Sequence, residues 1–366
     1  MAPDPRPGHT PGSPQSNADG LRLAIDVLRA WITGGSCPSN STAEARRGAA
    51  ALLARNRLLG LVGDLLLQAG ADPEVWSAIS AFRRLTAQMN GANLLLMRRL
   101  FTLLAEIERP VVVYKGVVLQ NDLYGTPFAR PASDVDLLTH PEDYGSVAAA
   151  FQTAGYRLNP HTDTLWWRRF LAEQQFRRGD EAQSIDLHHR IQQPGCPMPR
   201  RPERLITHAR MQPFIGGAFL TFDPRHRVLV AAMSLAKSLH HREPAGRYLG
   251  DLGHLLTRIP AEDWDALRQE AVDQGLSGTL DLARRCVAAV FGIEVGPSRG
   301  HILSEVSDTD LQLMLLAPEQ AVWIRRRRLL QAICDRPADI LTSWLVMAAS
   351  ESARLTSAPS LPREPV

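Results

Sequence analysis

The spacing of apolar residues changes twice along the chain, and these two changes limit the folds that it can adopt. From Gly20 to Glu108 apolar residues recur every three or four positions, which is typical of helices. At Arg109–Pro110 this pattern gives way to short β-branched runs such as VVVY, and after Asp223 the helical spacing returns. We therefore predict an α+β protein, with a small mixed β-sheet and its helices flanked by N-terminal and C-terminal helical units.

Composition and Gly/Pro positions set the expected boundaries of these units. Residues 1–19 and 351–366 contain few apolar side chains to offset the entropy of ordering, so we predict tails there. Between them we predict an N-terminal helical unit (20–108), an α/β core (109–222) and a C-terminal helical domain (223–350). Within the last, helices are expected at 246–257, 261–274, 277–291 and 317–333.

Net charge and cysteine content exclude few functions. A formal charge of +3 is too weak by itself to indicate a nucleic-acid or membrane partner. The four cysteines lie far apart without a CxxC pair, which predicts reduced thiols rather than zinc or disulfides. No apolar run approaches the ~20 residues of a membrane span, and no signal peptide is evident, so we expect a cytoplasmic protein.

Two carboxylates interrupt an apolar run in the sequence DVDLLTH. If this run is a strand, Asp134 and Asp136 point to one face while Val135 and Leu137 point into the core. Adjacent anions on one face repel each other, so they are stable only at an exposed edge or with a cation between them. The apolar surroundings favour a bound divalent metal ion.

A third carboxylate, Asp186, lies in the similar run SIDLHHR. The segments EQQFRR and SIDLHHR are separated by GDEAQ, which predicts a β-hairpin. If this strand lies beside DVDLL, three carboxylates converge, and their oxygens favour Mg²⁺ or Mn²⁺. A two-metal site of this kind indicates phosphoryl or nucleotidyl transfer. His188 shares the face of Asp186 and could orient a phosphate or Asp186 itself.

The segment that follows the first predicted strand could bind phosphates. Gly116 allows close approach of the backbone at a helix start, where free N–H groups attract anions, and Lys115 adds a positive charge. Of the 41 basic residues only Lys115 and Lys237 are lysine. The scarcity of lysine has two equally good explanations, a coding bias towards arginine or a need for a compact ammonium at these two sites. Lys237 shares a helix face with His241, so it either contacts the nucleotide phosphates or is simply solvated.

Together these motifs resemble the uncharacterised bacterial nucleotidyltransferases of the DNA polymerase beta superfamily. The resemblance rests on KG, a helix ending in LY, an arginine, a D-hydrophobic-D-LL strand and a later hydrophobic-D-LH strand, over roughly residues 90–260. It implies a triphosphate turn, metal ligands and further nucleotide-binding positions. The corresponding residues are Lys115 and Gly116 for the turn, Asp134, Asp136 and Asp186 for the metal, and Arg130 and His188 for the nucleotide. The interval from Gly116 to Asp134 is longer than in many superfamily members.

The resemblance implies a metal-dependent enzyme that transfers a nucleoside monophosphate from a nucleoside triphosphate, ATP by default, to an acceptor. Asp186 would bind the metal nearest the acceptor and accept its proton. The modest basic surface favours a small molecule or natural-product intermediate as acceptor. A toxin-like enzyme that modifies tRNA or protein, and a catalytically silent nucleotide- or partner-binding relative, remain as alternatives.

Three other features have simpler explanations than function. Trp166–Trp167 could stack on a base, but adjacent aromatic residues more often cover the edge of a core. The run Arg325–Arg328 could bind RNA, yet a solvated helix face is favoured. The pairs His188–His189 and His240–His241 have no further ligands at a zinc spacing.

Overall fold

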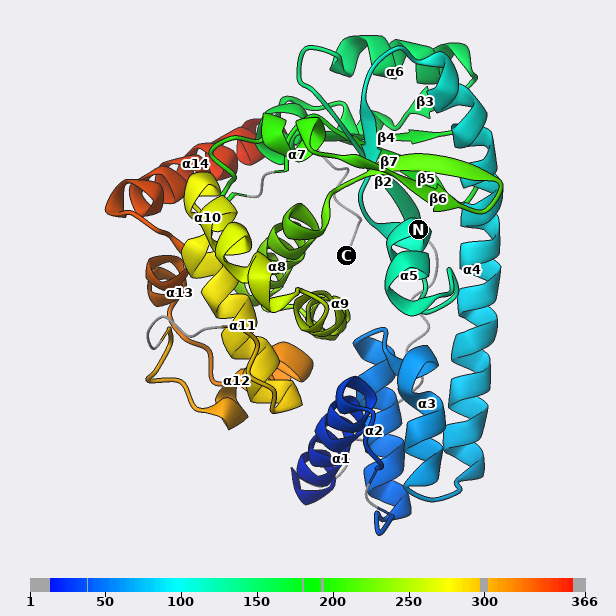
Figure 1. Ribbon diagram of the computed structural model, residues 1–366, viewed down its shortest axis with the longest axis vertical. Coiled ribbons are helices and arrows are strands. Elements are labelled where there is room, and N and C mark those ends of the chain that lie inside the picture. The colour runs from blue at the N-terminus through cyan, green and yellow to red at the C-terminus, as the bar shows by residue number, and fades with distance from the viewer. Residues whose placement is uncertain (1–13, 38, 180, 192–193, 297–301, 358–366) are drawn as a thin grey trace, which may run out of the picture.

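The computed structural model describes residues 14–37, 39–179, 181–191, 194–296 and 302–357. The N-terminal part consists of α1 (Pro14–Thr33), α2 (Ala43–Arg55), α3 (Leu59–Gln68) and α4 (Pro73–Glu106). Asp72 caps α4 by accepting hydrogen bonds from the N–H groups of Glu74 and Val75, and Pro73 suits its first turn. At 34 residues, α4 is about 50 Å long and joins the N-terminal helices to the sheet (Figure 1).

The central sheet has five strands in the order β1-β2-β5-β4-β3. β2 pairs antiparallel with β1 and parallel with β5, while β4 pairs antiparallel with both β5 and β3. Its strands are β1 (Val111–Val113), β2 (Asp134–Thr139), β3 (Arg157–Leu158), β4 (Glu173–Arg177) and β5 (Ser184–His188). The predicted hairpin is thus confirmed as β4–β5. A separate two-stranded sheet contains β6 (Arg210–Phe214) and β7 (Gly217–Thr221).

One face of the main sheet packs against helices. Val135, Leu137 and Ile185 are buried there in a cluster with Leu100 of α4 and Phe151 of α6 (Tyr144–Thr153). The helices of this part are α5 (Gly116–Tyr124), α6 (Tyr144–Thr153) and α7 (Glu203–Thr207), with a 3-10 turn at Pro160–Thr162 and a π-helical turn at Trp167–Leu171. The alternation of side chains leaves the predicted acidic residues on the opposite face.

The C-terminal part is helical, as predicted. It contains α8 (Pro224–His241), α9 (Gly246–Thr257), α10 (Trp264–Gln274), α11 (Ser277–Phe291), α12 (Asp308–Leu316), α13 (Arg326–Ile333) and α14 (Pro337–Ser357), with 3-10 turns at Ala261–Asp263 and Pro318–Gln320. Mixed helices and sheet confirm the predicted α+β class. The described residues contain no helix that is long and apolar enough to cross a membrane.

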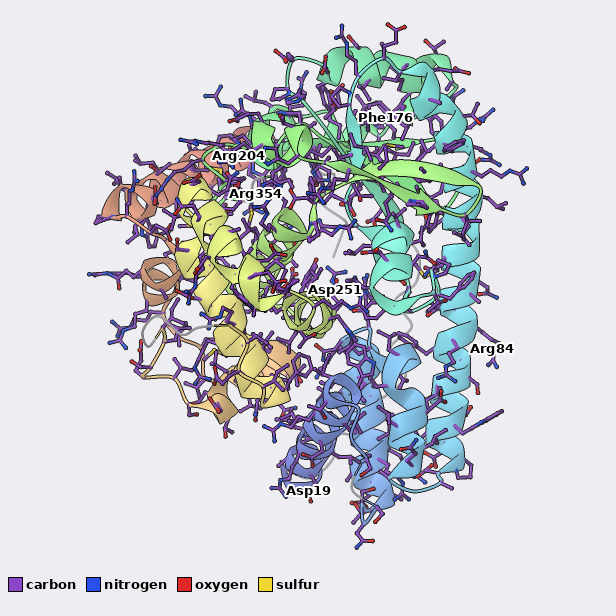
Figure 2. The ribbon with its side chains drawn as sticks, viewed as in Figure 1. Asp19, Arg84, Phe176, Arg204, Asp251 and Arg354 are labelled. Atoms are coloured by element: carbon purple, nitrogen blue, oxygen red, sulfur yellow. The ribbon has the colours of Figure 1, made fainter. Side chains whose placement is uncertain are left out.

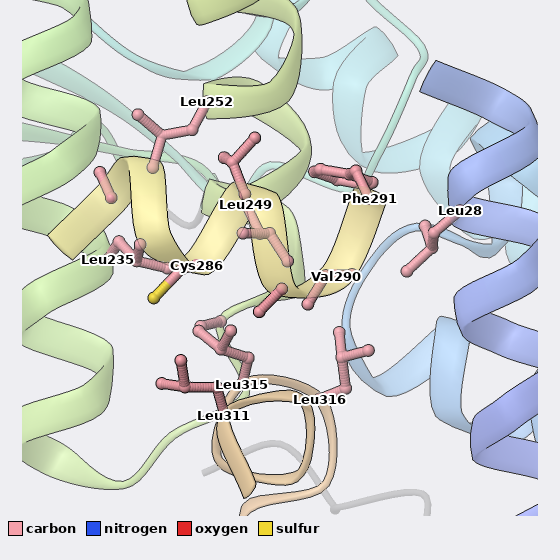
Figure 3. Close-up of a cluster of buried hydrophobic side chains, with 14 of the residues drawn as sticks. Leu28, Leu235, Leu249, Leu252, Cys286, Val290, Phe291, Leu311, Leu315 and Leu316 are labelled. Atoms are coloured by element: carbon pink, nitrogen blue, oxygen red, sulfur yellow. The ribbon is translucent and has the colours of Figure 1, made fainter. Parts of the chain in front are cut away.

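The two helical units share one hydrophobic core although they are far apart in the sequence. A single cluster of buried side chains includes Leu28 of α1, Leu53 of α2, Leu235 of α8, Leu249 of α9 and Phe291 of α11. Figure 3 shows this core around α11, with Leu28 on one side and Leu235 on the other. The N-terminal helices α1 to α3 therefore pack against the C-terminal helices, and α4 continues to the sheet.

Three predicted boundaries differ from the structure. α1 begins at Pro14 rather than Gly20, and α14 extends to Ser357, past the predicted end at residue 350. The predicted helix 317–333 is wrong before Arg326, where α13 begins. The Trp323 indole N–H donates a hydrogen bond to the Pro318 carbonyl, 3.0 Å away, which holds the intervening segment as a loop. Residues 1–13 and 358–366 of the predicted tails lie outside the described residues.

The predicted free thiols are confirmed, and the tryptophan pair lies beside α14. The four cysteines are buried and free. The Trp166 indole donates a hydrogen bond to Ser350 Oγ on α14 at 2.8 Å, and its ring contacts Trp167 edge to face. Trp166 thus attaches this segment to α14, and packing of the pair over a core edge stays a prediction.

Candidate active site

The parallel pairing of β2 with β5 brings the three predicted aspartates together. In this register Asp136 lies directly beside Asp186, and Asp134 lies two residues earlier on the same face of β2. All three line a pocket of about 280 Å³. The other predicted site residues also line it: Lys115, Gly116, Arg130, His188 and Lys237.

The three aspartates differ in the direction in which their pKa values are shifted. Burial, followed by the charges of Asp136 and Asp134, raises the pKa of Asp186 to about 7. Burial and Asp136 also raise the pKa of Asp134. Burial alone would raise the pKa of Asp136 as well, but Lys115 and His188 hold it below its ordinary value. Such crowding of carboxylates is relieved by a divalent cation, and three carboxylates are the oxygen donors that Mg²⁺ or Mn²⁺ prefers. The residues present therefore fit a metal site.

Lys115 and Gly116 lie against the acidic residues despite the long interval that follows them. Lys115 precedes α5, and its Nζ is 3.4 Å from Asp136 Oδ1. Gly116 has a left-handed backbone (φ +69°), and a Cβ placed there would lie 3.4 Å from the Asp134 carbonyl oxygen. The first N–H groups of α5 therefore open beside the carboxylates, as a phosphate turn requires.

The long interval is folded back by buried amide side chains. Asn90 Nδ2 donates hydrogen bonds to the carbonyls of Pro127 (2.6 Å) and Arg130 (2.8 Å), and Asn90 Oδ1 accepts one from Ala132 N–H. Asn93 of the same helix binds the Ala132 carbonyl at 2.7 Å. α4 thus fixes the loop before β2, which explains how the extra residues fit without displacing Asp134.

Gly116→Ala tests this geometry. An L side chain at φ +69° is strained, so we expect a loss of about 1–2 kcal/mol in the free energy of unfolding, together with weaker nucleotide binding. The control is Gly145→Ala in α6, where a Cβ meets nothing within 4 Å and should be neutral or stabilising. Urea denaturation of both variants measures the difference, and equal stabilities would show that Gly116 is not needed for its conformation.

Arg130 is bound by a carboxylate on α9. Its guanidinium forms a buried ion pair with Asp251, with Nη2 2.6 Å from Oδ2, and Tyr124 Oη donates to Asp251 Oδ1 at 2.6 Å. In Figure 2, Asp251 lies on α9 on the side of α5. Arg130 therefore joins the part of the chain that contains the five-stranded sheet (the sheet unit) to the C-terminal helices. The phosphate contact expected for Arg130 stays a prediction.

His188 contacts a different carboxylate from the one that the sequence indicated. Its Nε2 is 3.4 Å from Asp136 Oδ1, and its Nδ1 is 3.2 Å from Glu173 Oε2. The roles expected for His188, orienting a phosphate or Asp186, stay predictions. The antiparallel register of β4 and β5 pairs Glu173 with His188, so the imidazole bridges Glu173 and Asp136. Asp186 is held instead by Gln175 Nε2, at 3.1 Å.

Lys237 projects from α8 into the pocket. Its side chain is exposed, and no hydrogen bond or ion pair joins it to another residue in the described parts of the chain. This arrangement leaves its ammonium accessible to an anionic ligand.

Sequence reasoning missed several pocket residues, four of which matter for the chemistry. Glu173 lies on β4, Arg57 follows α2, and Arg247 and Tyr248 lie at the start of α9. Glu173 lies on a predicted strand of the hairpin, but only the register with β5 places it opposite His188. The other three reach the pocket only because the N-terminal and C-terminal helices pack together.

A second group of possible metal ligands lies outside this pocket. Atoms of His208, Asp223 and His226 lie within 4.8 Å of one another. Asp223 caps α8 through the N–H groups of Arg225 and His226, and His226 Nε2 lies 3.0 Å from Glu270 Oε1. These internal pairings account for the buried charges, so we assign no metal there.

One of the comparisons with known proteins identifies a family. A family model described as an uncharacterised nucleotidyltransferase matches residues 45–292. No curated protein matches the chain significantly. Among solved structures, the antibiotic-resistance factor ANT(2'')-Ia is similar at 15% identity over 50% of this chain and 91% of that one, with a TM-score of 0.35, too distant to carry an argument. Because the family match spans more than half of the chain, the protein belongs to this family of nucleotidyltransferases.

Proposed function

We propose that the protein transfers a nucleoside monophosphate from a nucleoside triphosphate to an acceptor and releases pyrophosphate. The observation that carries this proposal is the β2–β5 register, which collects Asp134, Asp136 and Asp186 beside the N-terminus of α5. The three aspartates would hold Mg²⁺ or Mn²⁺, which when bound would neutralise the phosphate charge and polarise the α-phosphate.

Other residues of the pocket would bind the phosphates, orient Asp136 and accept a proton. Lys115, Gly116 and Lys237 would bind the phosphates, while His188, held by Glu173, would orient Asp136. Asp186 would accept the acceptor's proton as the new oxygen–phosphorus or nitrogen–phosphorus bond forms and the bond to the departing pyrophosphate breaks.

A small-molecule acceptor suits this pocket better than a macromolecule. Sheet, N-terminal helices and C-terminal helices all contribute to its lining. Arg325–Arg328, the basic run that could have bound RNA, does not line it. We keep ATP as the default donor. Modification of tRNA or protein and nucleotide binding without catalysis are the alternatives, and the complete acidic set disfavours the silent one.

Pyrophosphate release tests the proposal. The wild-type protein, incubated with Mg²⁺, each of the four nucleoside triphosphates and pools of candidate acceptors, should release pyrophosphate, and Asp134→Asn should not. Asp265→Asn, whose side chain is 94% exposed, is the control for loss of a surface charge. Metal-independent release, or release that Asp134→Asn leaves unchanged, would contradict the proposal.

The raised pKa of Asp186 predicts how stability depends on pH in the metal-free protein. The folded state binds the Asp186 proton more tightly than the unfolded state, so the stabilisation is present below pH 4 and is lost as the pH rises towards the folded value of about 7. Between pH 5 and pH 8 the wild type should lose roughly 2 kcal/mol more than Asp186→Asn. Urea denaturation in EDTA measures both, and parallel pH curves would show that Asp186 has an ordinary pKa.

A further inference from the structure

Two arginines lie together on the wall of the pocket that the helical units provide. Arg57 follows the end of α2, and Arg247 lies in the first turn of α9. Within the described residues neither guanidinium has a carboxylate partner. Arg247 donates a hydrogen bond to Tyr248 Oη (2.5 Å) and lies over the Tyr248 ring, 4.4 Å from its centroid. Arg57 is exposed to solvent within the pocket, and partial desolvation by the pocket walls, followed by the charge of Arg247, lowers the pKa of its guanidinium. Two like charges that form no ion pair on a pocket wall favour an anionic ligand.

One buried side chain holds both arginines in place. Asn56 Nδ2 donates to the carbonyls of Leu52 (2.9 Å) and Leu316 (2.8 Å), and Asn56 Oδ1 accepts from Gly246 N–H at 2.9 Å. Asn56 directly precedes Arg57, and Gly246 directly precedes Arg247. A Cβ at Gly246 would lie 2.6 Å from Asn56, so this close approach also requires the glycine. The packing of distant helices thus fixes the two cations beside each other.

The backbone at Arg57 indicates that its side chain is needed. Arg57 has φ +59°, the left-handed conformation that follows a helix end and that glycine adopts most readily. A non-glycine residue there is strained, and strain of this kind is concentrated at functional sites. The side chain is exposed in the pocket, so packing does not explain the choice of arginine.

The pair lies in the same pocket as the first residues of α5. Arg57 and Arg247 line this pocket together with Lys115 and Gly116, where the N-terminus of α5 favours phosphate oxygens. Asp186 lies on β5 and is held by Gln175 of β4 at 3.1 Å. The guanidinium fork is suited to bidentate binding of phosphate oxygens.

We propose that Arg57 and Arg247 form a polyphosphate subsite that binds the β- and γ-phosphates of the nucleoside triphosphate, the part that leaves as pyrophosphate. This inference rests on the proposed function. It assigns binding of the departing pyrophosphate to two residues that lie outside the sheet unit. An acidic acceptor could supply similar oxygens, so the test must separate the two sources.

Calorimetric titration in EDTA isolates the subsite from any metal. Wild type, Arg57→Gln and Arg247→Gln are titrated with pyrophosphate, inorganic tripolyphosphate and citrate. We expect wild type to bind the two polyphosphates more tightly than citrate, and each variant to weaken polyphosphate binding at least about tenfold. The control is Arg84→Gln, an exposed arginine at the outer side of α4, which should change nothing (Figure 2).

Arg57→Gly separates binding from folding. Because glycine suits the left-handed backbone, this variant should melt at the same or a higher temperature than wild type while losing polyphosphate affinity.

Unchanged polyphosphate affinity in both glutamine variants would overturn the inference. Tighter binding of citrate, with its affinity lost in the variants, would also overturn it in favour of an acidic acceptor. If the wild type binds polyphosphate but releases no pyrophosphate in the presence of metal and nucleotide, the proposed function is overturned and the subsite is not.

Discussion

Asp136→Asn is expected to lower the turnover number about 10³-fold or more, the largest effect among the site residues. Asp136 is the central acid of the pocket. It lies beside Asp186 in the sheet and is 3.4 Å from both Lys115 Nζ and His188 Nε2. Its lowered pKa keeps it ionised, as a metal ligand must be. Removing its charge removes electrostatic stabilisation of the transition state, which is usually the largest single catalytic contribution.

Steady-state kinetics of pyrophosphate release measure this loss, with the melting temperature as a check that the variant folds. His188→Gln is measured beside it. This substitution removes the imidazole that lies between Glu173 and Asp136 but leaves Asp134, Asp136 and Asp186 in place. We expect an intermediate loss of about 10–100-fold, as for residues that orient metal ligands. An Asp136→Asn enzyme with near wild-type turnover would remove Asp136 from the mechanism.

Asp251→Ala is expected to cost about 3–5 kcal/mol of the free energy of unfolding, the largest effect on stability. Asp251 and Arg130 are buried, with side chains 3% and 9% exposed, so the substitution leaves an uncompensated guanidinium inside the protein. Tyr124 would lose its acceptor as well. Because this network connects the sheet unit to α9, activity should fall together with stability.

An exposed ion pair is the matched control for Asp251. Asp64 binds Arg83 at 2.8 Å, but its side chain is 72% exposed, so Asp64→Ala should cost less than about 1 kcal/mol. Urea denaturation of both variants gives the comparison. Equal losses would mean that the Arg130–Asp251 pair does not hold the units together.

The acidic site could be predicted from the sequence because its signals are local. Alternation along DVDLL and SIDLHH places Asp134, Asp136 and Asp186 on one face of their strands, and the turn between EQQFRR and SIDLHH fixes a hairpin. The structure confirms that β2 and β5 are neighbours, which the sequence suggested only through the requirement for convergent carboxylates. The α+β class and the helices 246–257 and 277–291 followed in the same way from period and caps.

What the sequence did not predict depends on tertiary structure. Arg57 and Arg247 are 190 residues apart and meet only because Asn56 binds Gly246 across the shared helical core. His188 contacts Glu173 because of a strand register that no local pattern specifies. Likewise Arg130 pairs with Asp251, which lies on a helix far along the chain. Periodicity describes the face of an element, but it does not identify the element packed against that face.

The central claim is that three aspartates form one divalent-metal site for a nucleotide. Binding of Mn²⁺, followed by electron paramagnetic resonance with and without ATP, tests it most directly. Wild type should bind Mn²⁺ more tightly when ATP is present, and Asp134→Asn, Asp136→Asn and Asp186→Asn should each weaken that binding at least about tenfold. If all three variants bind Mn²⁺ with ATP as tightly as wild type does, the carboxylates of β2 and β5 are not a metal site and the account is wrong.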